Sequence, residues 1–247
     1  MRVLILGGTG EARHLAQLAS GERGFDIVSS LAGRVRDPSL PSGEVRIGGF
    51  GGATGLREWL TDNRVDAVVD ATHPFAATIT ENATTAAAEA GVSLVHLRRQ
   101  GWSAQPGDRW TRVPDLATAA TATADFGPRI FLTIGRQGVH AFATVTSHWF
   151  LIRAIDPPEG ALPPRHELLL ARGPFTVAAE SELLADHRID ALVTKDSGAP
   201  DVTAKLTAAR EANLPVIMIN RPPLPENTLI TETAAATLDW LRGLRKH

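Results

Sequence analysis

The stretch VLILGGTGEARHLAQLAS, residues 3–20, determines how the rest of the sequence is interpreted. Its apolar start predicts a buried strand, a glycine-rich turn follows, and the last part has good helix formers with apolar residues at helical spacing. Similar apolar runs, FDIVSS (25–30), DAVVDA (66–71) and VSLVHL (92–97), alternate with helical segments along the chain. This alternation predicts an α/β fold with parallel sheets covered by helices on both faces.

The pattern starts a second time at IFLTIG, residues 130–135. Residues 57–72 match residues 181–196 at seven of sixteen positions, which is typical of an internal repeat. The alternative is that two βα units have converged on a similar composition. We expect two Rossmann-like domains with parallel sheets that arose by internal duplication.

The length of the chain fits two such domains. Its 247 residues are enough for two α/β units of about 120 residues each. Gly127 and Pro128 interrupt a helical segment rich in alanine and threonine, which marks the expected boundary. We therefore expect domains of residues 1–126 and 127–247, with the active site in the cleft between them.

The composition excludes several classes of function. A net charge of −2 creates no field that would gather nucleic acid or an anionic membrane. The chain has no cysteine, which excludes disulfides, thiolate nucleophiles and cysteine-bound zinc, and no metal site is predicted. It also has no tyrosine, so a reductase mechanism with a Tyr proton donor is excluded. The first apolar run is too short for a signal peptide or a membrane span, and we expect a cytoplasmic enzyme.

The glycine-rich turn after the first strand predicts a site for a dinucleotide. Gly8, Thr9, Gly10 and Glu11 stand between a strand and a helix, where a pyrophosphate can approach the backbone and the helix N-terminus stabilises its charge. The turn departs from the GxGxxG pattern because Arg13 occupies the position of the third glycine. A glycine-rich turn without a ligand is the structural alternative.

The end of the second strand favours NADP over NAD. Sites for NAD usually have an acidic residue there, about 20 residues after the glycine loop, whereas this chain has Ser30 followed by Arg34. A hydroxyl beside a guanidinium suits a 2'-phosphate. Alternatively, Arg34 is an ordinary solvated charge. The missing acid also counts against a methyltransferase that binds S-adenosylmethionine.

Residues that follow the other strands are candidates for catalysis because ligands of such sheets bind beyond the carboxyl ends of the strands. Thr72 and His73 follow the fourth run and are expected to face the nicotinamide or the substrate. In the repeat, Lys195, Asp196 and Ser197 align with Ala71, Thr72 and His73. A structural role for His73, and a capping or pairing role for Lys195 with Asp196, are the alternatives.

The ordered segments GGTGEAR, DATHPFA, RRQGW, IGRQG and TKDSG, which span residues 7–198, resemble the precorrin-6A reductase family. The resemblance implies that NADPH reduces a carbon of the precorrin-6A macrocycle, to give precorrin-6B in cobalamin (vitamin B12) biosynthesis, while a neighbouring carbon is protonated. No metal or flavin is then required. A tetrapyrrole is the expected partner, and the protein is expected to be a monomer or small homo-oligomer.

The substrate of that family carries acetate and propionate arms, which basic side chains would bind. The candidates by position are Arg98, Arg136, Lys195, Ser197 and Arg221.

Three side chains remain open as proton donors, besides water: His73, Lys195 and Asp196. Two other functions also remain open. One is a non-catalytic sensor that binds NADP, and the other is a Rossmann-type methyltransferase.

Overall fold

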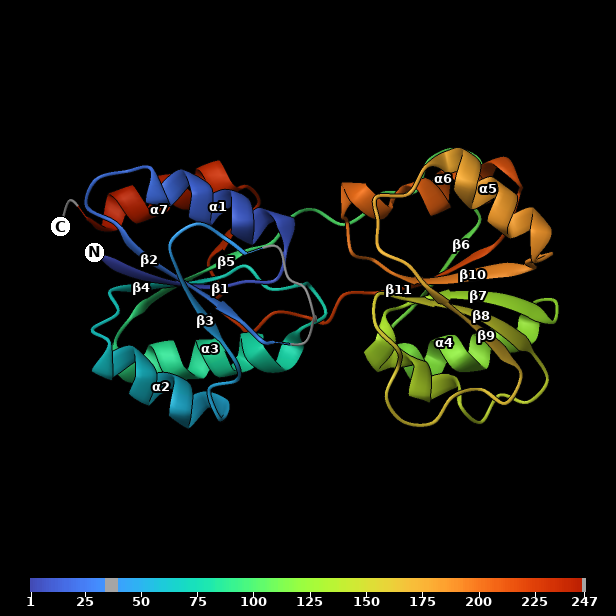
Figure 1. Cartoon of the computed structure of the whole chain (residues 1–247), viewed down its shortest axis with the longest axis horizontal. Coiled ribbons are helices and arrows are strands. Elements are labelled where there is room, and N and C mark those ends of the chain that lie inside the picture. Colours follow the sequence, from blue (N-terminus) through green and yellow to red (C-terminus); the bar gives the residue numbers. More distant parts are fainter. Residues whose placement is uncertain (34–39, 246–247) are drawn as a thin grey trace. The chain divides into compact units, whose positions relative to one another are not determined.

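The computed structural model describes residues 1–33 and 40–245. The described chain forms two compact units (Figure 1). The first contains Met1–Gln100 and Pro222–His247, and the second contains Gly101–Arg221. Each unit is built on a parallel sheet of six strands, which confirms two Rossmann-like domains.

The first sheet has the strand order β12-β5-β4-β1-β2-β3. Its strands are β1 (Arg2–Leu6), β2 (Asp26–Leu31), β3 (Glu44–Ile47), β4 (Ala67–Asp70), β5 (Ser93–Leu97) and β12 (Ile230–Thr231). The order reverses between β1 and β4, and ligands of open α/β sheets bind at such a switch point.

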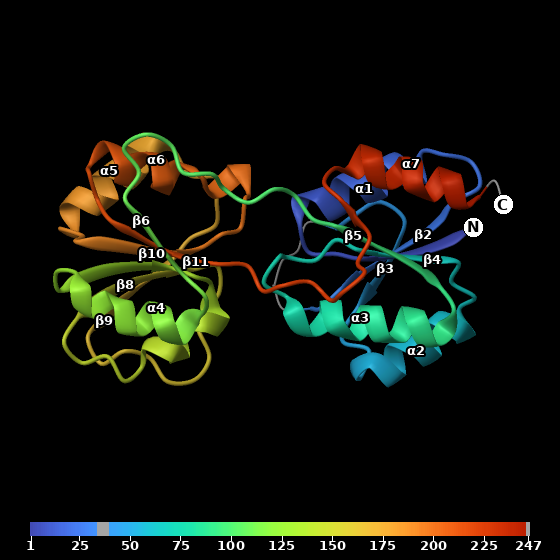
Figure 2. The same cartoon turned by 180° about the vertical axis from the view of Figure 1, so that it is seen from behind.

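Two pairs of helices cover the faces of this sheet (Figures 1 and 2). These helices are α1 (Gly10–Ser20), α7 (Ala234–Leu244), α2 (Gly52–Asp62) and α3 (Ala77–Ala90). Because side chains alternate along a strand, Val3 and Ile5 of β1 pack in the core beneath α1 and α7, while Leu4 and Leu6 pack beneath α2 and α3. The first strand is therefore buried on both faces, as its apolar run predicts.

The second sheet has the order β6-β11-β10-β7-β8-β9. Its strands are β6 (Trp110–Val113), β7 (Arg129–Thr133), β8 (Trp149–Ala154), β9 (His166–Leu170), β10 (Ala191–Lys195) and β11 (Val216–Ile219). The helices are α4 (Leu116–Ala122), α5 (Val177–Asp186) and α6 (Ala204–Glu211), with the 3-10 helices η1 (Thr123–Asp125), η2 (Arg136–Phe142) and η3 (Pro200–Val202). Helices α5 and α6 cover one face, and α4 covers the other (Figure 1).

The two units repeat one plan in detail, which supports the duplication. Asp66 accepts a hydrogen bond of 2.6 Å from the backbone N–H of Arg2, and its counterpart Asp190 accepts one of 2.9 Å from the backbone N–H of Arg129. Each aspartate thus fixes the start of the central strand of its own sheet. The turn residues Arg64 and Arg188, which are also aligned in the repeat, have left-handed φ values of 50° and 48°.

The division of the chain differs from the expected boundary between residues 126 and 127. After β5 the chain crosses into the second unit, where β6 pairs with β11. After β11 it crosses back, and β12 pairs with β5. The two units therefore exchange their sixth strands and the helices that follow them, α4 and α7. Local sequence patterns do not reveal which sheet such a short edge strand joins.

Candidate functional site

The carboxyl ends of β1, β2, β4 and β5 meet at one edge of the first sheet, because these strands are parallel. Two hydrogen bonds join the segments at this edge. The backbone N–H of Gly7 donates to the carbonyl of Ser30 at 2.9 Å, and the Thr9 hydroxyl donates to the carbonyl of Ala71 at 2.7 Å. The predicted dinucleotide residues of the first unit are therefore brought together, apart from Arg34, which lies outside the described residues.

The glycine loop is open at the positions where a phosphate would approach. Gly8 has a φ of +112°, and no atom lies within 4 Å of the position that a Cβ would take there. Gly10 is the first residue of α1, and the nearest atom to its missing Cβ is Nη2 of Arg13, at 3.9 Å. The buried Thr9 hydroxyl caps α1 by accepting from the N–H of Ala12 at 3.1 Å. Because the Thr9 hydroxyl already makes both of these bonds within the protein, a ligand would contact the backbone of Thr9 and not its side chain.

Glu11 forms an ion pair within the same unit. Its carboxylate lies 2.5 Å from Nη1 of Arg99, the second residue after β5. This pair joins the first turn of α1 to the end of a strand on the far side of β4. Glu11 was predicted to contact the cofactor, and its contact in the structure is with Arg99.

The end of β2 has a basic neighbour that the sequence reasoning missed. Ser30 is buried and is the register partner of Arg46 on β3, whose Nη1 lies 3.5 Å from the Ser30 hydroxyl. The Arg46 guanidinium also donates to the carbonyls of Gly48 and Gly49 and lies 3.8 Å above the ring of Phe50. The sequence signal for Arg46 was the run EVRIGG. Two glycines follow this short strand, as they follow the first strand.

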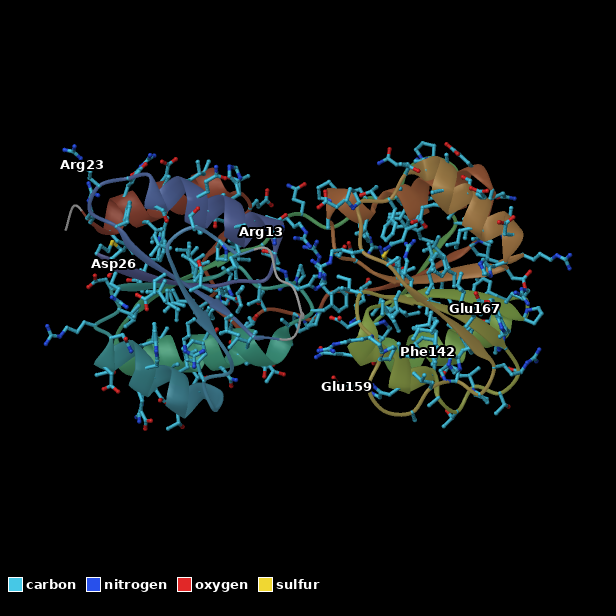
Figure 3. All side chains as sticks on the ribbon, in the orientation of Figure 1. Arg13, Arg23, Asp26, Phe142, Glu159 and Glu167 are labelled. Atoms are coloured by element: carbon cyan, nitrogen blue, oxygen red, sulfur yellow. The ribbon has the colours of Figure 1, made fainter. Side chains whose placement is uncertain are left out.

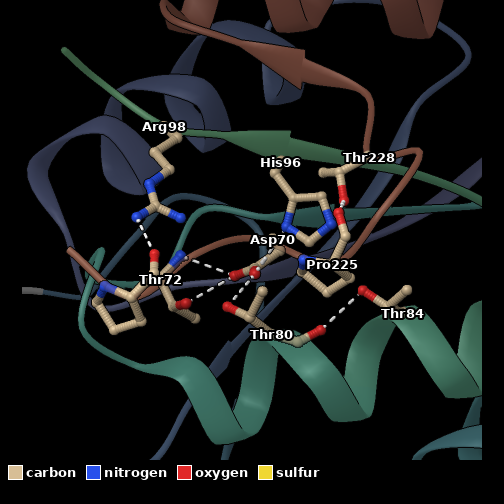
Figure 4. Close-up of polar contacts among 9 residues, drawn as sticks. Asp70, Thr72, Thr80, Thr84, His96, Arg98, Pro225 and Thr228 are labelled. Carbon is tan, nitrogen blue, oxygen red and sulfur yellow. Dashed lines mark hydrogen bonds and ion pairs between the residues drawn. The ribbon is translucent and has the colours of Figure 1, made fainter.

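At the end of β4, Asp70 is buried beneath a group of hydrogen-bond donors (Figure 4). Its Oδ1 accepts from the Thr72 hydroxyl at 2.7 Å and from the Thr72 N–H at 3.1 Å. Its Oδ2 accepts from the Thr80 hydroxyl at 2.7 Å and lies 3.0 Å from Nδ1 of His96. Burial raises the pKa of Asp70, but the bonds from His96, Thr72 and Thr80 together outweigh it and lower the pKa. Asp70 is therefore an ionised carboxylate at neutral pH.

A small pocket, with room for about one water molecule, opens over this network. Its lining residues are Asp70, Thr72, His73, Pro74, Thr80, His96, Leu97, Arg98 and Leu224. Three of the predicted site residues, Thr72, His73 and Arg98, thus line one pocket. His73 is exposed, and its Nδ1 accepts from the N–H of Phe75 at 3.2 Å. Arg98 donates to the carbonyl of Pro222 at 2.9 Å.

The second unit places other predicted residues at the carboxyl edge of its own sheet. Lys195 is the last residue of β10, and burial lowers its pKa. The buried Asp196 accepts from the N–H of Trp102 at 2.8 Å and from Nη1 of Arg112 at 3.1 Å, and its carbonyl accepts from Nε of Arg221 at 2.8 Å. Asp196 and Arg221 are therefore in contact, and Lys195 precedes Asp196 in the chain.

The contacts of Asp196 are packed tightly around a glycine. A Cβ on Gly101 would lie 2.8 Å from Oδ2 of Asp196, so the chain can pass this carboxylate only because residue 101 has no side chain. Asp196 thereby holds the segment that enters the second unit. Its part in catalysis stays a prediction, and the contacts described here are structural.

Two further predicted residues, Ser197 and Arg136, also lie in the second unit. Ser197 is buried, and its hydroxyl accepts from the N–H of Ala199 at 3.4 Å. Arg136 begins η2 after β7 and forms an ion pair of 3.3 Å with Glu159, whose exposed side chain is labelled in Figure 3. Arg136 thus stands after the carboxyl end of β7, partly exposed and paired with Glu159.

Neither a metal centre nor a membrane span is found in the part of the chain that the structure describes. No group of three or more His, Asp or Glu side chains in residues 1–33 and 40–245 is arranged to hold a metal ion. No described helix has the length and apolar character needed to cross a membrane.

Comparison with known proteins agrees with this architecture. The family model described as precorrin-6x reductase CbiJ/CobK matches residues 2–242. A precorrin-6A reductase of Rhodococcus erythropolis is 59% identical over 99% of both chains, and one of Rhodobacter capsulatus is 46% identical over 97% of this chain and 95% of its own. A solved structure, CobK precorrin-6A reductase, superposes with a TM-score of 0.90 at 46% identity, covering 99% of this chain and 97% of that one. The chain therefore belongs to the precorrin-6x reductase CbiJ/CobK family, a family of oxidoreductases.

Proposed function

We propose that this protein is a precorrin-6A reductase of cobalamin biosynthesis, which uses NADPH to reduce the tetrapyrrole to precorrin-6B. Membership of the family and the high identity to precorrin-6A reductases support the reaction. The observation that carries the cofactor is the open glycine loop, Gly8 to Gly10, which leads into α1 at the switch point of the sheet. When bound, NADPH would supply the hydride.

The residues of the first unit fit a phosphorylated nucleotide. The N-terminus of α1 presents backbone N–H groups and the positive end of the helix dipole to a pyrophosphate. At the end of β2, Ser30 and Arg46 offer a hydroxyl and a guanidinium, and Arg34 follows in the sequence. Residues 30–33, the described residues at this strand end, include no carboxylate that would repel a 2'-phosphate. These features favour NADPH over NADH.

The second unit would bind the carboxylate arms of the macrocycle. Lys195, Arg221 and Arg136 follow three of its strands, and Arg98 is the corresponding candidate from the first unit. Guanidinium and ammonium groups bind carboxylates through charge-assisted hydrogen bonds. We propose that side chains of the second unit bind the macrocycle and that the nucleotide is held mainly by the first unit.

Two side chains are the better candidates for delivering the proton. His73 is exposed beside the proposed nucleotide site, and Lys195 ends β10 with a pKa that burial lowers. Asp196 already accepts hydrogen bonds from Trp102 and Arg112, so we assign it a positioning part instead. The reaction itself depends mainly on holding donor and acceptor carbons at near-contact distance.

The direct test is turnover of precorrin-6A by the full chain under anaerobic conditions. NADPH consumption should match the formation of a product two mass units heavier, as expected for addition of one hydride and one proton. NADH should support a much slower reaction at equal concentration. NADPH binding without turnover would favour a sensor, and binding of S-adenosylmethionine in place of NADPH would favour a methyltransferase.

A further inference from the structure

We infer that Thr72, held by Asp70, recognises the carboxamide amino group of the nicotinamide and thereby distinguishes this ring from the carboxylate arms of the substrate. The inference rests on the proposed function, because it assumes that a nicotinamide nucleotide binds along the edge of the first sheet. It assigns a ligand contact to Thr72 and a positioning role to Asp70.

The first step is that Asp70 has no capacity left for a ligand. An ionised carboxylate offers about four lone-pair positions. Thr72 occupies two of them with its hydroxyl and its N–H, at 2.7 and 3.1 Å from Oδ1. Thr80 and His96 occupy the other two, at 2.7 and 3.0 Å from Oδ2. Asp70 therefore acts on a ligand only through the groups that it holds.

The second step concerns the direction of the hydrogen bond between Asp70 and Thr72. The pKa of Asp70 is lowered by its hydrogen bonds despite the opposing effect of burial, so the carboxylate accepts and the Thr72 hydroxyl must donate its single proton. The hydroxyl oxygen keeps its lone pairs. Thr72 is partly exposed and lines the pocket, so it meets a ligand as a hydrogen-bond acceptor.

The third step is the choice of ligand group. A carboxamide carries two N–H donors, whereas an ionised acetate or propionate arm has only acceptors. An acceptor with a buried negative charge 2.7 Å behind it attracts the amide N–H and repels the carboxylate. The Thr72 oxygen is thereby suited to an amide N–H of the nicotinamide and unsuited to a carboxylate.

The position of Thr72 in the sheet is consistent with this contact. Ser30 and Arg46, the candidates for the 2'-phosphate, lie on β2 and β3, on one side of β1. Thr72 follows β4, on the other side of β1. A dinucleotide with its pyrophosphate at the N-terminus of α1 extends to both sides of that point. The hydrogen bond from Thr9 to Ala71 ties the phosphate loop to the residue before Thr72.

The test compares the full-length protein's affinity for NADP+ with its affinity for the acetylpyridine analogue, in which a methyl ketone replaces the carboxamide and no N–H donor remains. The wild type should bind NADP+ about three- to tenfold more tightly, the range for one neutral hydrogen bond. Thr72→Ala should abolish this preference, and Thr72→Ser should retain it.

Thr80→Val is the matched control, because Thr80 donates to the other oxygen of the same carboxylate. It should lower the stability of the protein and leave the preference for NADP+ unchanged. Loss of the preference in Thr80→Val but not in Thr72→Ala would overturn the assignment.

The experiment distinguishes failure of the proposed function from failure of the inference about Thr72. If the wild type binds neither nucleotide, the proposed function fails. If it binds both with equal affinity, or if Thr72→Ala keeps the wild-type ratio, the inference fails while the proposed function stands. A Thr72→Ala protein that raises the KM for precorrin-6A with an unchanged nucleotide ratio would also overturn the inference, since Thr72 would then serve the substrate.

Discussion

The two units share one strand order but differ at the loop that follows the central strand. After β1, the open glycine loop leads into α1, a helix of 11 residues. After β7, Gly135 leads into η2, a 3-10 helix of 7 residues, and Gly138 is packed so tightly that a Cβ would lie 3.0 Å from Leu116. Within the described residues, the loop after the central strand thus leads into an open α-helix N-terminus in the first unit and into a packed 3-10 helix in the second.

The charges at the equivalent strand ends also differ. After β4, the carboxylate of Asp70 is satisfied by hydroxyls, a backbone N–H and His96. After β10, Lys195 and the pair of Asp196 with Arg112 bring cations to the corresponding place. This difference is the basis of the proposal that the first unit binds the nucleotide and the second the anionic substrate.

The largest effect is expected for Gly10→Val. A branched side chain at the start of α1 would occupy the space of the pyrophosphate, so NADPH affinity should fall at least about a hundredfold, which corresponds to ~2.7 kcal/mol. The protein should still fold, because no atom lies closer than 3.9 Å to the missing Cβ. NADPH titration and circular dichroism would measure the two properties.

Gly138→Ala in the second unit is the matched control for that loop. It should reduce stability through its contact with Leu116 and leave NADPH affinity unchanged. Normal binding by Gly10→Val, or loss of binding by Gly138→Ala, would contradict the difference drawn between the two loops.

The next effect in size is expected for Lys195→Ala. Loss of a charge-assisted contact to a carboxylate arm should raise the KM for precorrin-6A roughly 10- to 100-fold and leave NADPH affinity nearly unchanged. Steady-state kinetics would separate the parameters. A fall in kcat with constant KM would instead assign Lys195 to proton delivery.

A smaller effect, about tenfold, is expected when the guanidinium of Arg46, beside Ser30, or that of Arg34, which follows in the sequence, is removed. Arg46→Ala and Arg34→Ala should each weaken NADPH binding and have little effect on NADH. The ratio of the two dissociation constants is the measurement. Equal losses of affinity for NADPH and NADH would show that neither residue binds the 2'-phosphate. An effect of one variant alone would identify the residue that binds it.

A further effect, on stability and not on binding, concerns a buried lysine of the second unit. Lys205 of α6 is 5% exposed, and burial, together with the charge of Arg153, lowers its pKa to about 7. Between this value and the unfolded pKa near 10.4, the unfolded chain binds more protons than the native one. The free energy of unfolding should therefore rise with pH from about 7, by up to ~1.4 kcal/mol per pH unit.

Urea denaturation of the wild type and of Lys205→Met at several pH values from neutral upward would isolate this contribution. The variant should lack the rise, and its stability should exceed that of the wild type most clearly at neutral pH. Parallel pH profiles for the two proteins would show that Lys205 remains charged in the native state.

The sequence predicted those parts of the fold that local patterns encode. The runs that end near Gly7, Ser30, Ala71 and Leu97 form strands, and the carboxyl ends of these strands do gather at one sheet edge. The exchange of β6 and β12 was missed, because β12 has only two residues and its pairing with β5 is a contact distant in sequence. A fragment of residues 1–126 would lack both β12 and α7.

The sequence also predicted only some of the residues of the candidate site. The positions of Thr72 and His73 beside the switch point follow from the strand pattern, since each strand end is local. Asp70 and His96 were not singled out, because their contact joins neighbouring strands 26 residues apart. Arg46 was missed for the same reason, as its importance depends on the pairing of β3 with β2.

The exchange of the sixth strands affects the order in which the two units can fold during synthesis on the ribosome. The core of the first unit includes Ala234, Leu238 and Leu241 of α7, whereas the second unit, Gly101–Arg221, is continuous in sequence. During synthesis the second unit has all its strands before α7 has emerged. The unit that is translated first therefore completes its core last, and until then the apolar surface of α1 that α7 will cover stays open to chaperones.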